Sequence, residues 1–126
     1  MTKAPKTVLI VEDSVTQAES LRVTLMENGL KVYCALDGIS GLERAREIHP
    51  DLIVMDVHMP GMNGFEVAQA LKADPVTENI PIVMLTSSDN PESTLMGLDA
   101  GAVDYIPKDV FALSVLLETV RQMGLI

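Results

Sequence analysis

The chain has 126 residues, a formal net charge of −9 at pH 7 and a hydrophobic fraction of 48%. This length suits one domain with a single core, and the apolar content argues against intrinsic disorder. The acidic balance argues against direct nucleic-acid binding, which needs a basic surface, and no apolar run is long enough to span a membrane. The composition therefore fits a soluble domain that binds a metal cation or the basic surface of a partner.

Five short, mostly apolar runs are separated by segments with helical periodicity. Turn-forming residues bound the runs, and such continuous apolar stretches are typical of strands that are buried on both faces. We expect these strands at residues 7–11, 31–35, 52–56, 82–86 and 104–107.

Apolar residues at helical spacing predict a helix after each strand. Ser14-Val-Thr-Gln17 has the form of a capping box, and Gly29 is expected to close the first helix in the left-handed conformation. The next three helices are expected to begin near Asp37, Asn63 and Asn90-Pro91, and the last to follow Lys108 and end near Gly124. Strands and helices in alternation predict an α/β fold, with a parallel sheet covered by helices on both faces.

Polar residues that can do chemistry stand at the carboxyl ends of four predicted strands. They are Glu12-Asp13, Asp56, Thr86 and Lys108. These ends lie on one edge of a parallel sheet, so we expect the side chains to converge there. Three carboxylates at one edge repel one another, and a divalent cation relieves the repulsion. An all-oxygen site without Cys or a pair of His favours Mg²⁺, with Mn²⁺ as the alternative, over zinc.

With such a cation bound, Asp56 could attack a phosphoryl group and carry it as an acyl phosphate. Lys108 could pair with the phosphoryl oxygens, and the Thr86 hydroxyl could donate to another of them. Taken singly, each residue also has a plain structural interpretation. Asp56 could form a turn, Glu12-Asp13 could favour a helix start, Thr86 could be an ordinary strand residue and Lys108 a surface lysine.

Four segments carry a resemblance to the receiver domains of response regulators in two-component signalling. They are VLIVEDS at 8–14, DLIVMDVHMPGMNG at 51–64, PIVMLTS at 81–87 and GAVDYIPK at 101–108. The resemblance covers essentially the whole chain and implies a flavodoxin-like, doubly wound five-stranded parallel sheet in the order 2-1-3-4-5, with five helices. We therefore expect residues 1–126 to form a single receiver domain, with a core at about 7–123 and no output domain.

The resemblance also implies the roles of the clustered residues. Asp56 would be the phosphoacceptor, with Lys108 assisting. Asp13 and Asp56 would bind Mg²⁺ directly together with the backbone carbonyl of His58, and Glu12 would act mainly through water.

Thr86 and Tyr105 would form a switch pair, and Thr86 would also assist the chemistry. Their movement would change the surface made by the fourth helix, the fifth strand and the fifth helix, as a shift between two existing states.

The implied function is a cytoplasmic signalling module and not an enzyme, apart from Mg²⁺-dependent self-phosphorylation and slow autodephosphorylation. The phosphoryl group would come from a histidine kinase or a histidine phosphotransfer protein. The signal would pass to a downstream target protein or to an output domain on a longer chain. The module would act as a monomer or as a phosphorylation-dependent dimer.

Two alternatives remain open, and the first rests on a departure from the family pattern. Asp109 follows Lys108 where proline is usual, so we expect a trans peptide there and a carboxylate beside the lysine. This departure would suit a degenerate receiver that only binds partners. A Mg²⁺-dependent phosphohydrolase of the haloacid-dehalogenase type is another alternative, but it would need an acid where His58 stands.

Overall fold

The computed structural model describes residues 4–87 and 99–126, and its elements alternate along the chain. They are β1 (Thr7–Val11), α1 (Val15–Glu27), β2 (Lys31–Ala35), α2 (Gly38–Ile48), β3 (Leu52–Asp56), α3 (Gly64–Ala73), β4 (Ile82–Thr86), β5 (Asp104–Pro107) and α5 (Ala112–Gln122). All five predicted strands are confirmed with the predicted bounds. Four of the five expected helices lie in the described part, and the helix expected from Asn90-Pro91 falls on residues outside it.

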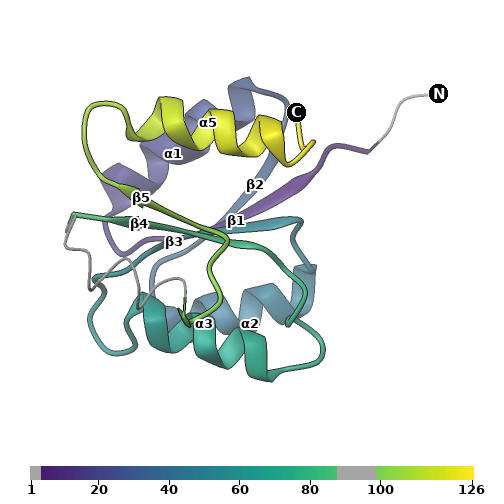
Figure 1. Ribbon diagram of the computed structural model, residues 1–126, viewed down its shortest axis with the longest axis vertical. Helices are drawn as coiled ribbons and strands as arrows, with labels where there is room; N and C mark the ends of the chain where they lie inside the picture. Colours follow the sequence, from purple (N-terminus) through teal and green to yellow (C-terminus); the bar gives the residue numbers. More distant parts are fainter. Residues whose placement is uncertain (1–3, 88–98) are drawn as a thin grey trace.

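The five strands form one parallel sheet in the order β2-β1-β3-β4-β5, which confirms the expected order. Helices α1 and α5 cover one face of the sheet, and α2 and α3 cover the other (Figure 1). The central strand β3 is buried along its whole length, so its last residue, Asp56, arrives at the middle of the carboxyl edge.

Alternate residues of β3 belong to two separate cores. Leu52 and Val54 pack on the α1 and α5 side, and Ile53 and Met55 pack on the α2 and α3 side, all four with no exposed surface. Burying such a side chain contributes about 1.5–3 kcal/mol, so both faces hold β3 in place. Packing on both faces therefore fixes the position of the strand end that carries Asp56.

The ends of the helices confirm most of the predicted caps. Gly29 has a φ of +87°, as predicted for the end of α1, and Asn63 forms a complete capping box with Glu66 at the start of α3. At α1 only half of the predicted box is present. The Ser14 Oγ accepts from the Gln17 N–H at 3.3 Å, but the Ser14 N–H donates to Glu12 Oε1 at 3.1 Å in place of the Gln17 side chain.

No helix in residues 4–87 and 99–126 has the length and apolar character needed to cross a membrane.

The loop after Asp56 folds back tightly onto the end of β3. The Gly64 N–H donates to the Val57 carbonyl at 2.9 Å, and a Cβ at Gly64 would lie 2.6 Å from the Asp56 carbonyl oxygen and 2.9 Å from the Val57 Cα. Backbone atoms cannot yield as a flexible side chain can. A glycine is therefore required where α3 begins beside Asp56.

We expect Gly64→Ala to lower the free energy of unfolding by about 1–3 kcal/mol, because the new methyl group would push the backbone on either side of Asp56. Urea denaturation measures the loss. Gly124→Ala serves as the comparison for backbone strain without a close contact, because φ is +79° there and no atom lies within 4 Å of the added Cβ. The close approach would be refuted if Gly64→Ala left the free energy of unfolding unchanged or raised it.

Candidate functional site

Three carboxylates meet at the carboxyl edge of the sheet, as the sequence predicts. Glu12 follows β1, Asp13 is next to it, and Asp56 ends β3. Carboxylate oxygens of the three residues lie within 4.8 Å of one another. Glu12 and Asp56 are 1% and 6% exposed, whereas Asp13 lies at the surface. The cluster could therefore hold a cation that enters from the Asp13 side.

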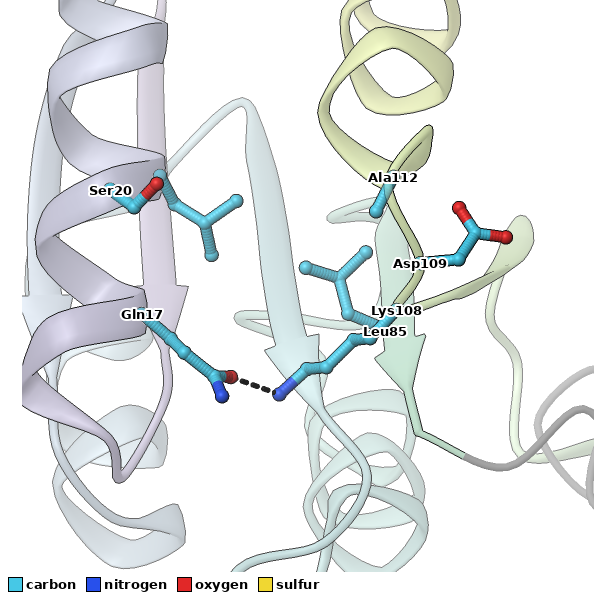
Figure 2. Close-up of a pocket in the computed structure, with 7 residues that line it drawn as sticks. Gln17, Ser20, Leu85, Lys108, Asp109 and Ala112 are labelled. Carbon is cyan, nitrogen blue, oxygen red and sulfur yellow. Dashed lines mark hydrogen bonds between the residues drawn. The ribbon is translucent and has the colours of Figure 1, made fainter.

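Lys108 directly follows β5 and lies over this cluster. Its Nζ is 2.9 Å from Glu12 Oε2 and 3.2 Å from Asp56 Oδ2. A third acceptor, Gln17 Oε1, lies 2.6 Å away and comes from α1 (Figure 2). The lysine thus joins the ends of β1, β3 and β5 to the first helix.

Burial sets the electrostatics of Glu12. Loss of water raises the pKa of the Glu12 carboxyl above its ordinary value, because burial disfavours the charged form. Hydrogen bonds from Lys108 and from the Ser14 N–H act in the opposite direction, and the nearby Asp56 charge raises the pKa further. The Lys108 ammonium beside Glu12 therefore favours the charged form of this carboxyl against the effect of burial.

The two oxygens of Asp56 face different groups. Oδ2 faces Lys108, and Oδ1 accepts a hydrogen bond from the His58 N–H at 3.2 Å. The His58 side chain is exposed. The loop after β3 thus fixes the orientation of the carboxylate through its own backbone.

The two predicted switch residues lie on neighbouring strands. Thr86 ends β4, is fully buried, and its carbonyl accepts from the Lys108 N–H at 2.6 Å. Tyr105 lies on β5 opposite Met84, and its ring packs against the core on the α2 and α3 side. The buried Tyr105 hydroxyl has no hydrogen-bond partner among the described residues.

Asp109 does not compete for the lysine ammonium. As predicted, the Lys108–Asp109 peptide is trans, since the described residues contain no cis bond. The Asp109 Oδ1 accepts from the Phe111 N–H at 2.8 Å, and Figure 2 shows its carboxylate turned away from the end of Lys108. Phe111 and not Asp109 is the N-cap of α5, so Asp109 stabilises the turn that leads into the helix.

Sequence reasoning assigned Gln17 to a capping box and missed its place in this site. Gln17 lies in the first turn of α1, which begins directly after Glu12, Asp13 and the N-cap Ser14, and this closeness in sequence to the acidic pair is the one signal that could have indicated its place. Gln17 and Lys108 also line a pocket of about 220 Å³ between α1 and the start of α5 (Figure 2). Its other lining residues are Ser20, Leu21, Leu85, Asp109 and Ala112.

The model of the response regulator receiver domain matches residues 8–121. The chain belongs to the response-regulator receiver family. It is 40% identical over 119 residues to the response regulator MprA of Mycobacterium sp. strain KMS, a match covering 94% of this chain and 50% of MprA. It is 41% identical over 116 residues to MprA of Mycobacterium leprae, covering 92% and 50%.

Solved receiver structures agree with this assignment. The chemotaxis protein CheY4 of Vibrio cholerae superimposes with a TM-score of 0.87 at 34% identity, covering 94% of this chain and 98% of CheY4. The receiver domain of a histidine kinase from Syntrophus aciditrophicus gives 0.85 at 36% identity, covering 94% and 89%.

The chain spans about half the length of the curated relatives that it matches. Family membership identifies it as a response-regulator module of two-component signalling, and not as an enzyme in the usual sense. The phosphohydrolase alternative is set aside.

In a chelator-treated sample we expect Asp13→Asn to raise the urea midpoint of unfolding, because it removes one of three clustered like charges. Glu43→Gln is the control, since this exposed carboxylate lies outside the cluster and its loss changes the net charge equally. Equal shifts for the two variants would show that the cluster carries no excess repulsion.

Tyr105→Phe is expected to leave the free energy of unfolding unchanged or to raise it by up to about 1 kcal/mol, because it removes a buried hydroxyl without a partner. Urea denaturation measures the change, with Tyr33→Phe on β2 as the control. A clear destabilisation specific to Tyr105→Phe would contradict the unpaired state of this hydroxyl.

Proposed function

We propose that Asp56 accepts a phosphoryl group, in the cytoplasm, from a histidine kinase or a histidine phosphotransfer protein. A carboxylate oxygen of Asp56 attacks phosphorus, the bond from phosphorus to the donor nitrogen breaks, and the donor imidazole keeps the electron pair. One observation carries this proposal. Asp56 ends the central strand with its carboxylate between an acidic pair and a lysine ammonium 3.2 Å away.

The residues present fit a divalent cation. The cluster offers carboxylate oxygens from Glu12, Asp13 and Asp56, which is the donor type that Mg²⁺ prefers, and Mn²⁺ accepts the same donors. We propose Asp13, Asp56 and the His58 carbonyl as direct ligands, with Glu12 acting through water. When bound, the ion supplies positive charge that offsets the acids and the incoming phosphoryl oxygens.

The chain's own groups position the reacting atoms. The Lys108 ammonium already contacts Asp56 Oδ2 and can turn the same N–H to a phosphoryl oxygen. The Thr86 hydroxyl belongs to a residue whose backbone is tied to Lys108. Positioning and charge neutralisation are the main demands of phosphoryl transfer, and both groups serve them.

We further propose that phosphorylation is read out through Thr86 and Tyr105. The added group brings about −1.5 to −2 charges, which favours a state with the Thr86 hydroxyl turned toward it. Tyr105 responds because its hydroxyl has no partner among the described residues to hold it.

The surface beside these residues suits a partner protein. Four apolar side chains lie exposed on or next to β5 and the first half of α5, namely Val103, Val110, Phe111 and Val115. Val110 is 89% exposed and Phe111 is 66% exposed. Val110 and Phe111 are adjacent in the chain and Val115 lies one helical turn after Phe111, and local apolar exposure of this kind is typical of interaction surfaces.

We propose that residues 1–126 act as one receiver unit. Its signal passes to a separate target protein or to an output domain of a longer chain, with the receiver as a monomer or as a dimer formed on phosphorylation.

Incubation with Mg²⁺ and acetyl phosphate is expected to add one phosphoryl group, seen by intact-protein mass spectrometry. Asp56→Asn and a chelator should each abolish the adduct, because one removes the acceptor and the other removes the cation. Asp51→Asn, with a carboxylate outside the cluster, is the control that should still be labelled.

An adduct that persists in Asp56→Asn would refute Asp56 as the acceptor. A complete lack of adduct in the wild type, with Mg²⁺ binding intact, would favour a receiver that only binds partners.

A further inference from the structure

The Lys108 ammonium has three N–H groups and three acceptors within hydrogen-bond distance. Two are carboxylates, Glu12 at 2.9 Å and Asp56 at 3.2 Å, and the third is the Gln17 side-chain carbonyl at 2.6 Å. The shortest of these contacts is the only one from a neutral group, and it joins α1 to the end of β5 across 91 positions of the chain (Figure 2).

Gln17 is free to make this contact because its local role is filled by another residue. In a capping box its side chain would turn back to the Ser14 N–H. Here that N–H donates to Glu12 Oε1 at 3.1 Å. Glu12 accepts a hydrogen bond from Lys108 through Oε2. Through Oε1 it accepts from the Ser14 N–H, which leaves the Gln17 side chain available to Lys108.

We infer that Gln17 is a positioning residue that holds the Lys108 ammonium over Asp56. This inference rests on the proposed phosphorylation of Asp56. Gln17 touches neither Asp56 nor the phosphoryl group, and acts only through the lysine.

The chemistry of the site explains why a neutral acceptor suits this position. During phosphorylation, Lys108 must give the N–H that faces Asp56 to a phosphoryl oxygen. Glu12 and Gln17 can keep the other two, so the ammonium is retained while one partner changes. A carboxylate at position 17 would instead draw the lysine toward α1 and add negative charge beside the incoming group.

Without the Gln17 acceptor, the Lys108 ammonium can move away from Asp56. Its long side chain has several rotatable bonds, and the pocket of about 220 Å³ between α1 and the start of α5 is lined by Lys108 itself. An ammonium with one unsatisfied N–H can turn into that space and bind water.

The test compares wild type, Gln17→Met and Ser20→Ala for the rate of Mg²⁺-dependent labelling by acetyl phosphate. Met keeps the length and helix propensity of Gln but removes the acceptor. Ser20 lies on the same helix and lines the same pocket, but makes no hydrogen bond to Lys108. We expect Gln17→Met to lower the rate about tenfold, the effect of one lost hydrogen bond to a charged group, and Ser20→Ala to match wild type.

A second readout follows the lysine directly. The Lys108 Nζ signal in ¹⁵N NMR, assigned with Lys108→Met, is expected to be visible in wild type and to broaden through water exchange in Gln17→Met. A general loss of structure would not single out this signal, and urea denaturation of Gln17→Met should show one cooperative transition, with no greater loss of stability than one partly exposed hydrogen bond accounts for.

The two possible failures are distinguishable. A Gln17→Met protein that is labelled at the wild-type rate, or that keeps an unchanged Lys108 signal, overturns the positioning role while the proposed function stands. A wild-type protein that takes no phosphoryl group overturns the proposed function and the catalytic part of this inference together.

Discussion

The pairing of Lys108 with buried carboxylates is the interaction on which this site depends. Glu12 and Asp56 are almost fully buried at one sheet edge, where each charge disfavours the other. The ammonium between them, 2.9 and 3.2 Å away, makes the burial of both acids tolerable. Because breaking such a pair leaves an uncompensated buried charge, the strand ends that carry these residues must keep their register.

The backbone around the pair is fixed on both sides. The bond from the Lys108 N–H to the Thr86 carbonyl extends the β4–β5 ladder past its last strand residue. The close approach of Gly64 holds the loop after β3 against Asp56. Since neither contact involves a carboxylate oxygen of Asp56, the carboxylate is held in place while its oxygens remain available to a cation and to Lys108.

The sequence predicts the elements well because local rules determine them. Each strand is an apolar run between turn residues, and all five bounds agree with the structure. The strand order is not determined by local rules. Its prediction rests on the family resemblance and not on the pattern of residues. The convergence of Glu12, Asp56 and Lys108 needs only the parallel arrangement of the strands, so the sequence predicts it without the strand order.

The role of Gln17 shows where such rules end. Ser14-Val-Thr-Gln17 satisfies a local capping pattern, and nothing within that segment indicates a partner 91 residues away. The fold supplies that partner, and Glu12 takes over the Ser14 N–H that Gln17 would otherwise bind. A side chain in a local motif thus becomes part of a long-range site when a stronger charged acceptor nearby fills its first role. For the same reason, the consequence of phosphorylation at Asp56 would extend to α1 as well as to β5, because the lysine that meets the new charge is held from both.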